Sequence, residues 1–596
     1  MFRMAKLAEY KLSGTSHSSF QFSECYNYEA IFNILCKLRC KVAFKRNAKH
    51  YYFDHIKGEK CKENKEDLFL MSLFPPRRKW LKLDPNLRNN KNRLPKTSTE
   101  RNLISLKLTV EYYKKREPSS EFLKKLDVYI ASICEHFQSG DILLNKPNVI
   151  PVLKKEDDGF KICRPLSIYS LTDKIILSIA NKYAIKIFDE IFKDCGYAFR
   201  AVREFPEGDR SPNHIDAFKK IIDFRTKHSD KVIWGAECDM CKFFDTVNHS
   251  FVIKRFDQFV KQKYFRKFGI EDLRLLRHIL KEYLKSYNFN KDVRSLSSNQ
   301  EYFRDFKIEN GRFDWVEKEF LENDFYKDLN KTRIGIPQGG ALSGFIANIL
   351  LHDADCKVIK HLDENSLYLR FCDDMIILST DRNICEKSYG AYINSLTKYK
   401  LVVHPHVGPD FKNLVEFWSS KSKLCYKWTS DDTKNTFWVG FVGLEINYFG
   451  DIRIRRSTLK KELKKQADLM LEMKRILKNV KRKSSPSSIL GSLQKRMVSM
   501  SVGRVDLWNY KSYPNEMSWA KGFKILNDNI HSRRQLKSLD RSRSLKIHKL
   551  MKFIEKKYRE DQTTKVDDTT DKDEERSFQI KHYGKPYSYY YNTLKK

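Results

Sequence analysis

Residues 366–380 read SLYLRFCDDMIILST, in which two adjacent carboxylates interrupt an otherwise apolar, strand-like run. Burying the charged Asp373 and Asp374 among apolar neighbours is costly unless a cation neutralises them, or unless a hairpin turn exposes them at its tip. Oxygen ligands of this kind suit magnesium. In either arrangement, the pattern favours a metal-binding site over a solvated acidic face.

A second carboxylate, Asp239, stands at the end of the apolar run KVIWGAECDM (231–240). Two carboxylate-bearing strands placed side by side would hold two divalent ions. One ion activates an attacking 3′-hydroxyl and the other stabilises a pyrophosphate leaving group. Asp245 is the competing acid in this stretch, and it can instead be a capping or turn residue that begins the next helix.

The charge of the chain points to a polyanionic partner. Its 596 residues include 114 Lys and Arg against 76 Asp and Glu, a formal net charge of +38. Such an excess attracts nucleic acid first. Residues 457–557 hold 26 basic and 8 acidic residues. Within them, 459–483 alternate apolar and basic residues at helical spacing, which predicts one core face and one positive face that follows phosphates or is merely solvated.

The cysteines and the apolar runs bear on the cellular compartment. Thirteen cysteines are scattered, and Cys238 and Cys241 alone have CxxC spacing, so we expect buried free thiols rather than a zinc site. Free thiols fit a reducing cytosol. The first residues lack the apolar core of a signal peptide, and no uncharged apolar run is long enough to cross a membrane. The sequence therefore predicts a cytoplasmic protein.

Six short motifs follow one another between about residues 145 and 456. They are GFKICRPLSIYSLTDKI (159–175), CGYAFRAV (195–202), DMCKFFDTVNH (239–249), RIGIPQGGALSGFIANILL (333–351), FCDD (371–374) and FVGLEI (441–446). In order and content they resemble bacterial reverse transcriptases of the group II intron and retron-like lineage. The unusual ends are most similar to the defence-associated members, the unknown-group and abortive-infection enzymes.

The resemblance implies an α+β fold, a right-hand polymerase with fingers and a palm built from an antiparallel sheet and helices, followed by a helical thumb. The expected divisions are a basic N-terminal extension (1–140), a fingers and palm core (141–456) with an insertion at about 285–331, a basic helical thumb (457–557), and an acidic linker with a tyrosine-rich tail (558–596).

The resemblance also assigns roles to the carboxylates. Asp239 and Asp373 would be the principal ligands of two Mg²⁺ ions, with Asp374 assisting and with Mn²⁺ able to substitute. The family usually carries a lysine after the double aspartate that protonates pyrophosphate. Val407 stands at that position here, which leaves His406 or Lys412 as substitutes.

Five further residues match the family's nucleotide contacts. Lys161 and Arg164 correspond to fingers residues that grip the triphosphate, where a guanidinium suits phosphate oxygens. Phe244 corresponds to the aromatic gate that clashes with a 2′-hydroxyl, unless it is ordinary core. Gln338 would support the nucleotide and the template base, and Gly339 would allow close approach of the backbone. The motif departs from the usual PQG…LSP in ending on LSG.

The implied activity is that of an RNA-directed DNA polymerase, a nucleotidyltransferase that copies an RNA template from dNTPs into DNA. A dedicated non-coding RNA would be the template in antiphage defence, and a homo-oligomer or a defence partner protein is left open. Two alternatives remain: an RNA-binding maturase of the group II intron type, and untemplated terminal addition of nucleotides.

The C-terminal tail adds one more hypothesis. Residues 561–576 have a disordered composition, and five tyrosines follow within nine residues. The tail either docks on the protein or on RNA, or it presents a hydroxyl that primes synthesis. The candidates for priming are Tyr583, Tyr587, Tyr589, Tyr590 and Tyr591.

Overall fold

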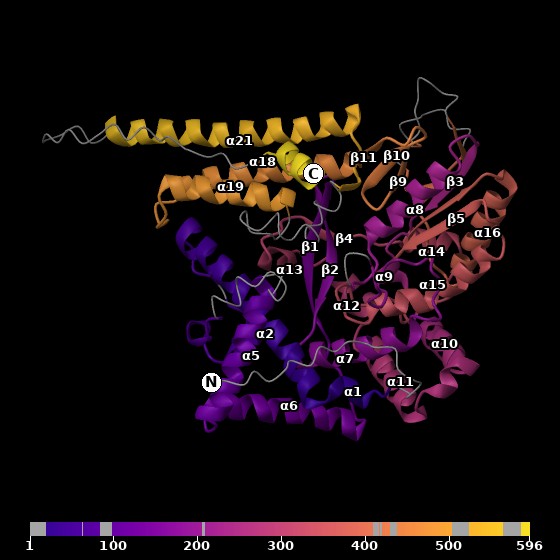
Figure 1. Ribbon diagram of the computed structural model, residues 1–596, viewed down its shortest axis with the longest axis horizontal. Coiled ribbons are helices and arrows are strands. Elements are labelled where there is room, and N and C mark those ends of the chain that lie inside the picture. The colour runs from indigo at the N-terminus through magenta and orange to yellow at the C-terminus, as the bar shows by residue number, and fades with distance from the viewer. Residues whose placement is uncertain are drawn as a thin grey trace, which may run out of the picture.

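The computed structural model describes most of the chain, as an α+β arrangement of helices around three small sheets (Figure 1). The described residues are 20–61, 63–83, 98–205, 209–408, 417, 420–429, 438–502, 524–563 and 586–595. Within these ranges, no helix combines the length and the apolar character that crossing a membrane requires.

A five-stranded sheet forms the centre of the palm, with strand order β5-β6-β3-β8-β7. Strand β3 pairs antiparallel with both β6 and β8. Met375 and Ile377 of β6 belong to the large core, whereas Ile376 and Leu378 belong to a second core on the other face. Burial on both faces explains why this run is continuously apolar instead of alternating. The strands are β3 (Ile233–Cys238), β5 (Ser366–Phe371), β6 (Asp374–Ser379), β7 (His406–Val407) and β8 (Ser422–Trp428).

Helices pack against this sheet and extend the large core. The apolar faces of α15 and α16 lie in that core together with α7, α10 and α11. The bounds are α7 (Leu171–Phe188), α8 (His214–Lys227), α9 (Phe243–Thr246), α10 (His249–Val260), η3 (Lys263–Lys267), α11 (Ile270–Lys285), α15 (Ser343–Ile359) and α16 (Arg382–Lys398).

The fingers consist of the antiparallel hairpin β1–β2, to which β4 adds in parallel. Because β4 lies at 311–313, the segment predicted to be an insertion is attached to the fingers sheet and has a small aromatic core of its own. The bounds are β1 (Asn148–Asp157), β2 (Phe160–Ile168), α12 (Phe289–Asp292), η4 (Arg294–Leu296), α13 (Gln300–Asp305), β4 (Gly311–Phe313) and α14 (Glu317–Glu322).

The N-terminal helices share the core of the palm. Phe22 stacks on Tyr183 of α7 with ring centroids 4.3 Å apart, and Leu35 and Leu126 lie in the same core as Ile175. The described part of 1–140 is therefore packed against the palm. Its helices are α1 (Ser23–Tyr26), α2 (Tyr28–His50), η1 (Tyr51–Lys57), α3 (Lys65–Ser72), η2 (Arg77–Lys79), α5 (Ser98–Arg116) and α6 (Glu121–Ser139).

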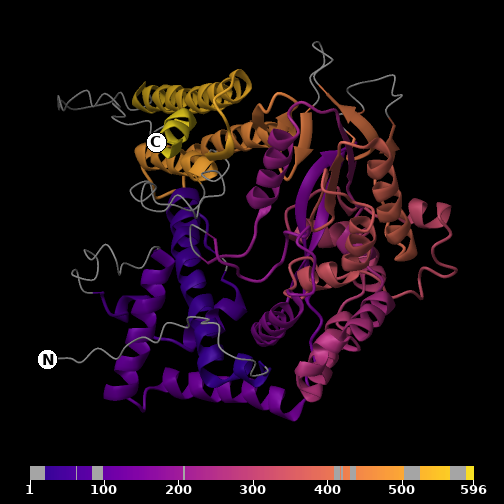
Figure 2. The ribbon, with the colours of Figure 1, turned by 45° about the vertical axis from the view of Figure 1, so that its right-hand side comes forward.

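The C-terminal helices, which the sequence analysis predicts to form the thumb, contact the N-terminal region (Figure 2). Tyr52 and Ile56 of η1 belong to the thumb's apolar core, and Asn479 Nδ2 donates a hydrogen bond of 2.7 Å to the carbonyl of Lys57. A three-stranded sheet leads into the thumb. The bounds are β9 (Trp438–Phe441), β10 (Leu444–Asn447), β11 (Ile452–Ile454), α18 (Arg456–Lys478), α19 (Pro486–Val502), α21 (Ile530–Thr563) and α22 (Tyr587–Lys595).

Candidate polymerase active site

Three carboxylates meet at one end of the palm sheet. Asp239 directly follows β3, and a tight turn at Cys372 and Asp373 joins β5 to β6, which begins at Asp374. Cys238 pairs with Met375, so the two neighbouring strands bring their acidic residues to the same edge. Cys372 adopts a left-handed φ of 62°, which costs energy in a residue other than glycine and is typical of functional turns.

The electrostatics of this edge show that the carboxylates repel one another. Burial, followed by the charge of Asp239, raises the pKa of Asp373. The same two causes raise the pKa of Asp374 well above its ordinary value, against the opposing effect of Arg455. A divalent cation would relieve this repulsion, and carboxylate oxygens are the ligands that magnesium prefers. The donor chemistry therefore fits the predicted ions.

The ammonium group of Lys421 neutralises part of the negative charge at this edge by pairing with Asp239. Lys421 Nζ lies 2.6 Å from Asp239 Oδ2 and 3.0 Å from His404 Nε2. Burial and Lys421 lower the pKa of His404 to about 4, so the ring is neutral at pH 7 and accepts the hydrogen bond. Among the described residues, no group of three or more His, Cys, Asp or Glu side chains is arranged to enclose an ion. The described carboxylates thus lie together, but they do not form a closed coordination shell.

Of the two predicted substitutes for the family's lysine, the structure describes His406. His406 Nδ1 is 2.7 Å from the hydroxyl of Tyr389, and Lys412 falls outside the described residues. Lys421, the residue directly before β8, places its ammonium group next to Asp239 instead. Sequence reasoning missed it because it is 182 residues from Asp239 and no local pattern marks it.

Asp245 lies beside Gln338. Its carboxyl is buried and accepts a hydrogen bond of 2.8 Å from Gln338 Nε2. Burial raises the pKa of Asp245 to about 6, despite the stabilising hydrogen bond and the nearby Lys242. The backbone N–H of Ser167 donates to the carbonyl of Gln338 at 2.9 Å. Asp245 therefore orients Gln338, a role that neither of the two sequence interpretations included.

Basic side chains gather beside Asp245. The Lys154 side chain is exposed, yet partial desolvation and the charges of Lys242, Arg164 and Lys421 lower the pKa of its ammonium. These four cations therefore share one region, which suits a triphosphate. Lys161 lies on the other face of β2 from Arg164, because the two residues are three positions apart and side chains alternate along a strand. The structure thus brings Arg164 to the cluster but does not bring Lys161.

Two glycines of the PQG segment allow close packing. At Gly339, φ is 92° and a Cβ would stand 2.8 Å from Leu166 Cδ1. At Gly344, a Cβ would stand 2.3 Å from the ring of Phe199. The departure from the usual LSP therefore accommodates Phe199, and α15 still begins at Ser343.

The predicted sugar gate is half-buried. Phe244 packs at the edge of the large core, with its ring centroid 5.4 Å from that of Phe243. Its carbonyl accepts a hydrogen bond of 2.7 Å from the N–H of Ile336, two residues before Gln338. The ring is therefore held next to the PQG segment.

A buried ion pair supports the double-aspartate turn. Arg370 and Asp355 form two hydrogen bonds of 2.8 and 2.7 Å, and each side chain is 2% exposed. Arg370 Nη1 also donates to the carbonyl of Cys372 at 3.1 Å, and the hydroxyl of Tyr368 donates to Asp355 at 2.7 Å. This network fixes the turn that carries Asp373. Its only mark in the sequence is a charged residue inside an apolar strand.

The tyrosine-rich tail is docked where the structure describes it. Tyr587 and Tyr591 are buried, and the Tyr587 hydroxyl donates to Glu462 at 3.3 Å. Tyr589 is partly buried in the same helix α22, which also contains Tyr590, and Tyr583 lies outside the described residues. Of the alternatives for the tail, docking on the protein agrees with the structure of 587–595, because helix α22 packs against α21. Burial also removes the hydroxyls of Tyr587 and Tyr591 from the solvent, from which a priming group would have to act.

Residues 152–406, which carry this site, match the family model described as "Reverse transcriptase (RNA-dependent DNA polymerase)". The chain contains a reverse transcriptase domain. The domain is that of an RNA-directed DNA polymerase, a nucleotidyltransferase, and its α+β fold is that of a right-hand-like polymerase, as predicted. Domains of this family generally use divalent metal ions.

Solved telomerase structures from two Candida species are also similar to this chain. A C-terminally truncated apo telomerase from Candida tropicalis is 13% identical over 52% of this chain and 55% of that chain, with a TM-score of 0.29. Telomerase from Candida albicans in complex with a telomeric RNA fragment is 13% identical over 82% of this chain and 81% of that chain, with a TM-score of 0.31. No curated protein matches the sequence.

Proposed function

We propose that the protein is a reverse transcriptase that extends a nucleic-acid primer with dNTPs on an RNA template. The observation that carries the proposal is the meeting of Asp239, Asp373 and Asp374 at one edge of the palm sheet, inside the matched domain. These carboxylates would hold two magnesium ions. When bound, magnesium supplies activation of the 3′-hydroxyl and neutralisation of the pyrophosphate that leaves.

The protein's own residues then position the nucleotide. Lys154, Arg164 and Lys242 present positive charge to the triphosphate, and Gln338, oriented by Asp245, supports the base. In this proposal Phe244 is the side chain that excludes a 2′-hydroxyl. Lys421 would have to leave Asp239, or share it, when a metal ion binds, because both compete for the same carboxylate oxygen.

The direct test is primer extension by the purified protein. An RNA template with an annealed DNA primer, supplied with dNTPs and magnesium, should give extended DNA, and chelation of the metal with EDTA should stop extension. A purified, folded protein that extends no primer under these conditions would refute the proposal.

The gate can be tested separately. Phe244→Ala should lower the ratio of dNTP to rNTP incorporation, since the smaller side chain leaves room for a 2′-hydroxyl. The ratio is measured in parallel reactions with matched nucleotide concentrations. If it stays at the wild-type value while activity persists, Phe244 is ordinary core and selection lies elsewhere.

The thumb offers exposed cations for the RNA. Arg475 and Lys478 of α18 are exposed, so Arg475→Gln/Lys478→Gln should leave the fold intact. Each lost phosphate contact should reduce the slope of log affinity against log salt by about 0.7 for a single strand. The matched control is Lys124→Gln/Lys387→Gln, which removes the same charge from α6 and α16. Equal slopes for the two double variants would show that this face of the thumb is merely solvated.

The narrower parts of the proposal rest on other observations. A role in antiphage defence with a dedicated non-coding RNA rests on the motif resemblance, and free thiols at all thirteen cysteines support the cytoplasm. The burial of Tyr587 and Tyr591 favours a primer supplied by nucleic acid over priming from the tail. Sequencing the nucleic acid that copurifies with the protein would separate a dedicated template from an intron RNA.

A further inference from the structure

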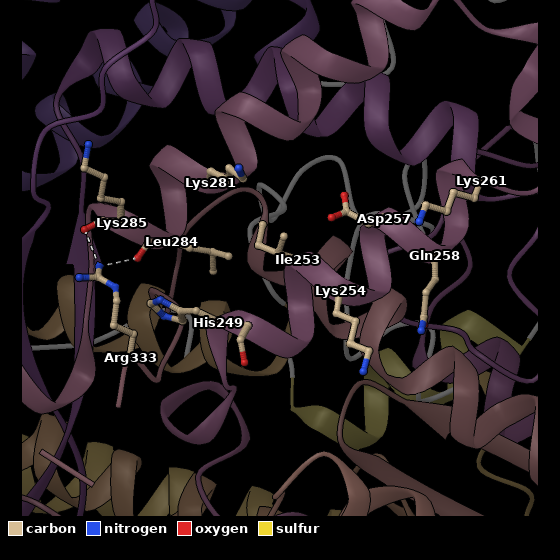
Figure 3. A pocket seen from close by; sticks show the side chains of 11 residues that line it. His249, Ile253, Lys254, Asp257, Gln258, Lys261, Lys281, Leu284, Lys285 and Arg333 are labelled. Carbon is tan, nitrogen blue, oxygen red and sulfur yellow. Dashed lines mark hydrogen bonds between the residues drawn. The ribbon is translucent and has the colours of Figure 1, made fainter. Parts of the chain in front are cut away.

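A cavity of about 720 Å³ opens between α10 and α11, beside the segment that leads into the PQG motif (Figure 3). None of the three palm aspartates is among its lining residues. Its walls carry five basic side chains: Lys254, Lys261, Lys281, Lys285 and Arg333.

Most of this positive charge is not neutralised locally. The one acidic side chain in the lining, Asp257, is bound by Arg277 through two hydrogen bonds of 2.5 and 2.6 Å. Lys285 pairs with Glu282 at 3.3 Å. Lys254, Lys261 and Lys281 form no ion pair with any residue that the structure describes, and they are exposed. The cavity therefore presents a net surplus of positive charge.

Arg333 keeps hydrogen-bonding capacity for a ligand. Its Nη2 donates to the carbonyls of Leu284 and Lys285 at 3.2 and 2.9 Å, which fixes the side chain at the end of α11. Nε and Nη1 make no hydrogen bond within the described part of the chain. A fixed guanidinium with free N–H groups is well suited to phosphate oxygens.

His249 joins the cavity to the polymerase site. Its ring lines the cavity and is buried, and Nε2 donates to the carbonyl of Gly335 at 2.6 Å, while Nδ1 has no partner among the described residues. Gly335 is three residues before Gln338. The cavity therefore lies next to the segment that carries Gln338, on the side where His249 contacts Gly335.

We propose that this cavity binds the phosphate backbone of an RNA strand outside the palm site. Lys254 on α10 and Lys261, which directly follows this helix, are seven positions apart. Along the helix axis this distance is about 10 Å, which is longer than one phosphate group. An RNA strand carries one phosphate charge per nucleotide, so a row of cations of this length can contact more than one phosphate.

The lining also argues for a backbone over a free nucleotide. Its lining contains no phenylalanine, tyrosine or tryptophan, and the ring of His249 is buried, so the cavity offers little aromatic surface on which a base could stack. Contacts to phosphate alone position a strand and carry no sequence information. The identification of the strand as RNA rests on the proposed function. Binding of the strand to the cavity does not require the polymerase reaction.

The test is binding of the full-length protein to a short fluorescent oligouridine, without dNTPs. Lys254→Gln/Lys281→Gln should weaken binding about tenfold and reduce the log–log salt slope by about 1.4, because two phosphate contacts are lost. The control Lys124→Gln/Lys387→Gln should leave both quantities at the wild-type value. Unlabelled ATP at concentrations that saturate a nucleotide site should not displace the oligouridine.

A second measurement uses the wild-type chain, so it does not depend on how a variant folds. Acetylation of exposed lysines, followed by mass spectrometry, should show that oligouridine protects Lys254 and Lys281 but not Lys124 and Lys387. Wild-type affinity and slope in the double variant, or absence of protection, would overturn the proposal. Displacement by ATP would overturn it too, and would assign the cavity to a free nucleotide. Failure of primer extension with intact protection would refute the proposed function alone.

Discussion

Asp373→Asn and Asp239→Asn are each expected to reduce the rate of dNTP incorporation by at least about a thousandfold. Each change removes a ligand charge from the proposed metal site, and metal ions contribute several kcal/mol of transition-state stabilisation, with tenfold in rate for every 1.36 kcal/mol. The amide preserves the shape of the side chain. Folding and RNA binding should therefore remain near the wild-type level, as circular dichroism and oligouridine binding would show.

The matched control is Asp353→Asn. This carboxylate lies on α15 and pairs with Lys357 and Lys398 at 3.5 and 3.4 Å, away from the palm edge. The control should retain most of the activity. Incorporation above about a tenth of the wild-type rate in either palm variant would contradict the assignment, since a lost metal ligand costs far more than a factor of ten.

Asp355→Ala is expected to lower the free energy of unfolding by about 3–5 kcal/mol, because it leaves the Arg370 guanidinium buried without its partner. The loss should appear as a lower urea midpoint with an unchanged m-value. The turn carrying Asp373 should also loosen, since Arg370 holds the carbonyl of Cys372.

The double variant Asp355→Leu/Arg370→Met separates charge from packing. Replacing a buried ion pair with apolar residues of similar size is often neutral, so the double variant should recover most of the stability that Asp355→Ala loses. It should not recover activity fully, because the hydrogen bond to Cys372 is gone. Equal stability of Asp355→Ala and the wild type would show that the pair does not support the turn.

The sequence predicted the parts of the site that rest on local patterns. The apolar runs around Asp239 and around Asp373 and Asp374 are strands, because continuous apolar stretches of that length suit a sheet buried on both faces. The class of fold was also predicted, and the match to the reverse transcriptase family over 152–406 confirms it. The metal and nucleotide roles of these residues remain predictions.

The rest depends on contacts between distant segments, which no local pattern encodes. Lys421 reaches Asp239 from 182 residues away, and Lys154 joins Arg164 only because β1 and β2 pair. Lys161 matched the motif, yet strand alternation places it on the opposite face from Arg164. The sequence analysis gave no packing partner for the N-terminal extension, whose apolar faces pack against the palm and against the C-terminal helices.

The measurement that tests the central claim most directly is the sequence of the DNA that the purified protein makes on a heteropolymeric RNA template. Extension of an annealed primer should give products complementary to the RNA, and Asp373→Asn should give none. Addition of nucleotides unrelated to the template, or synthesis that persists in Asp373→Asn, would contradict the proposal that Asp239, Asp373 and Asp374 form the centre of an RNA-directed DNA polymerase.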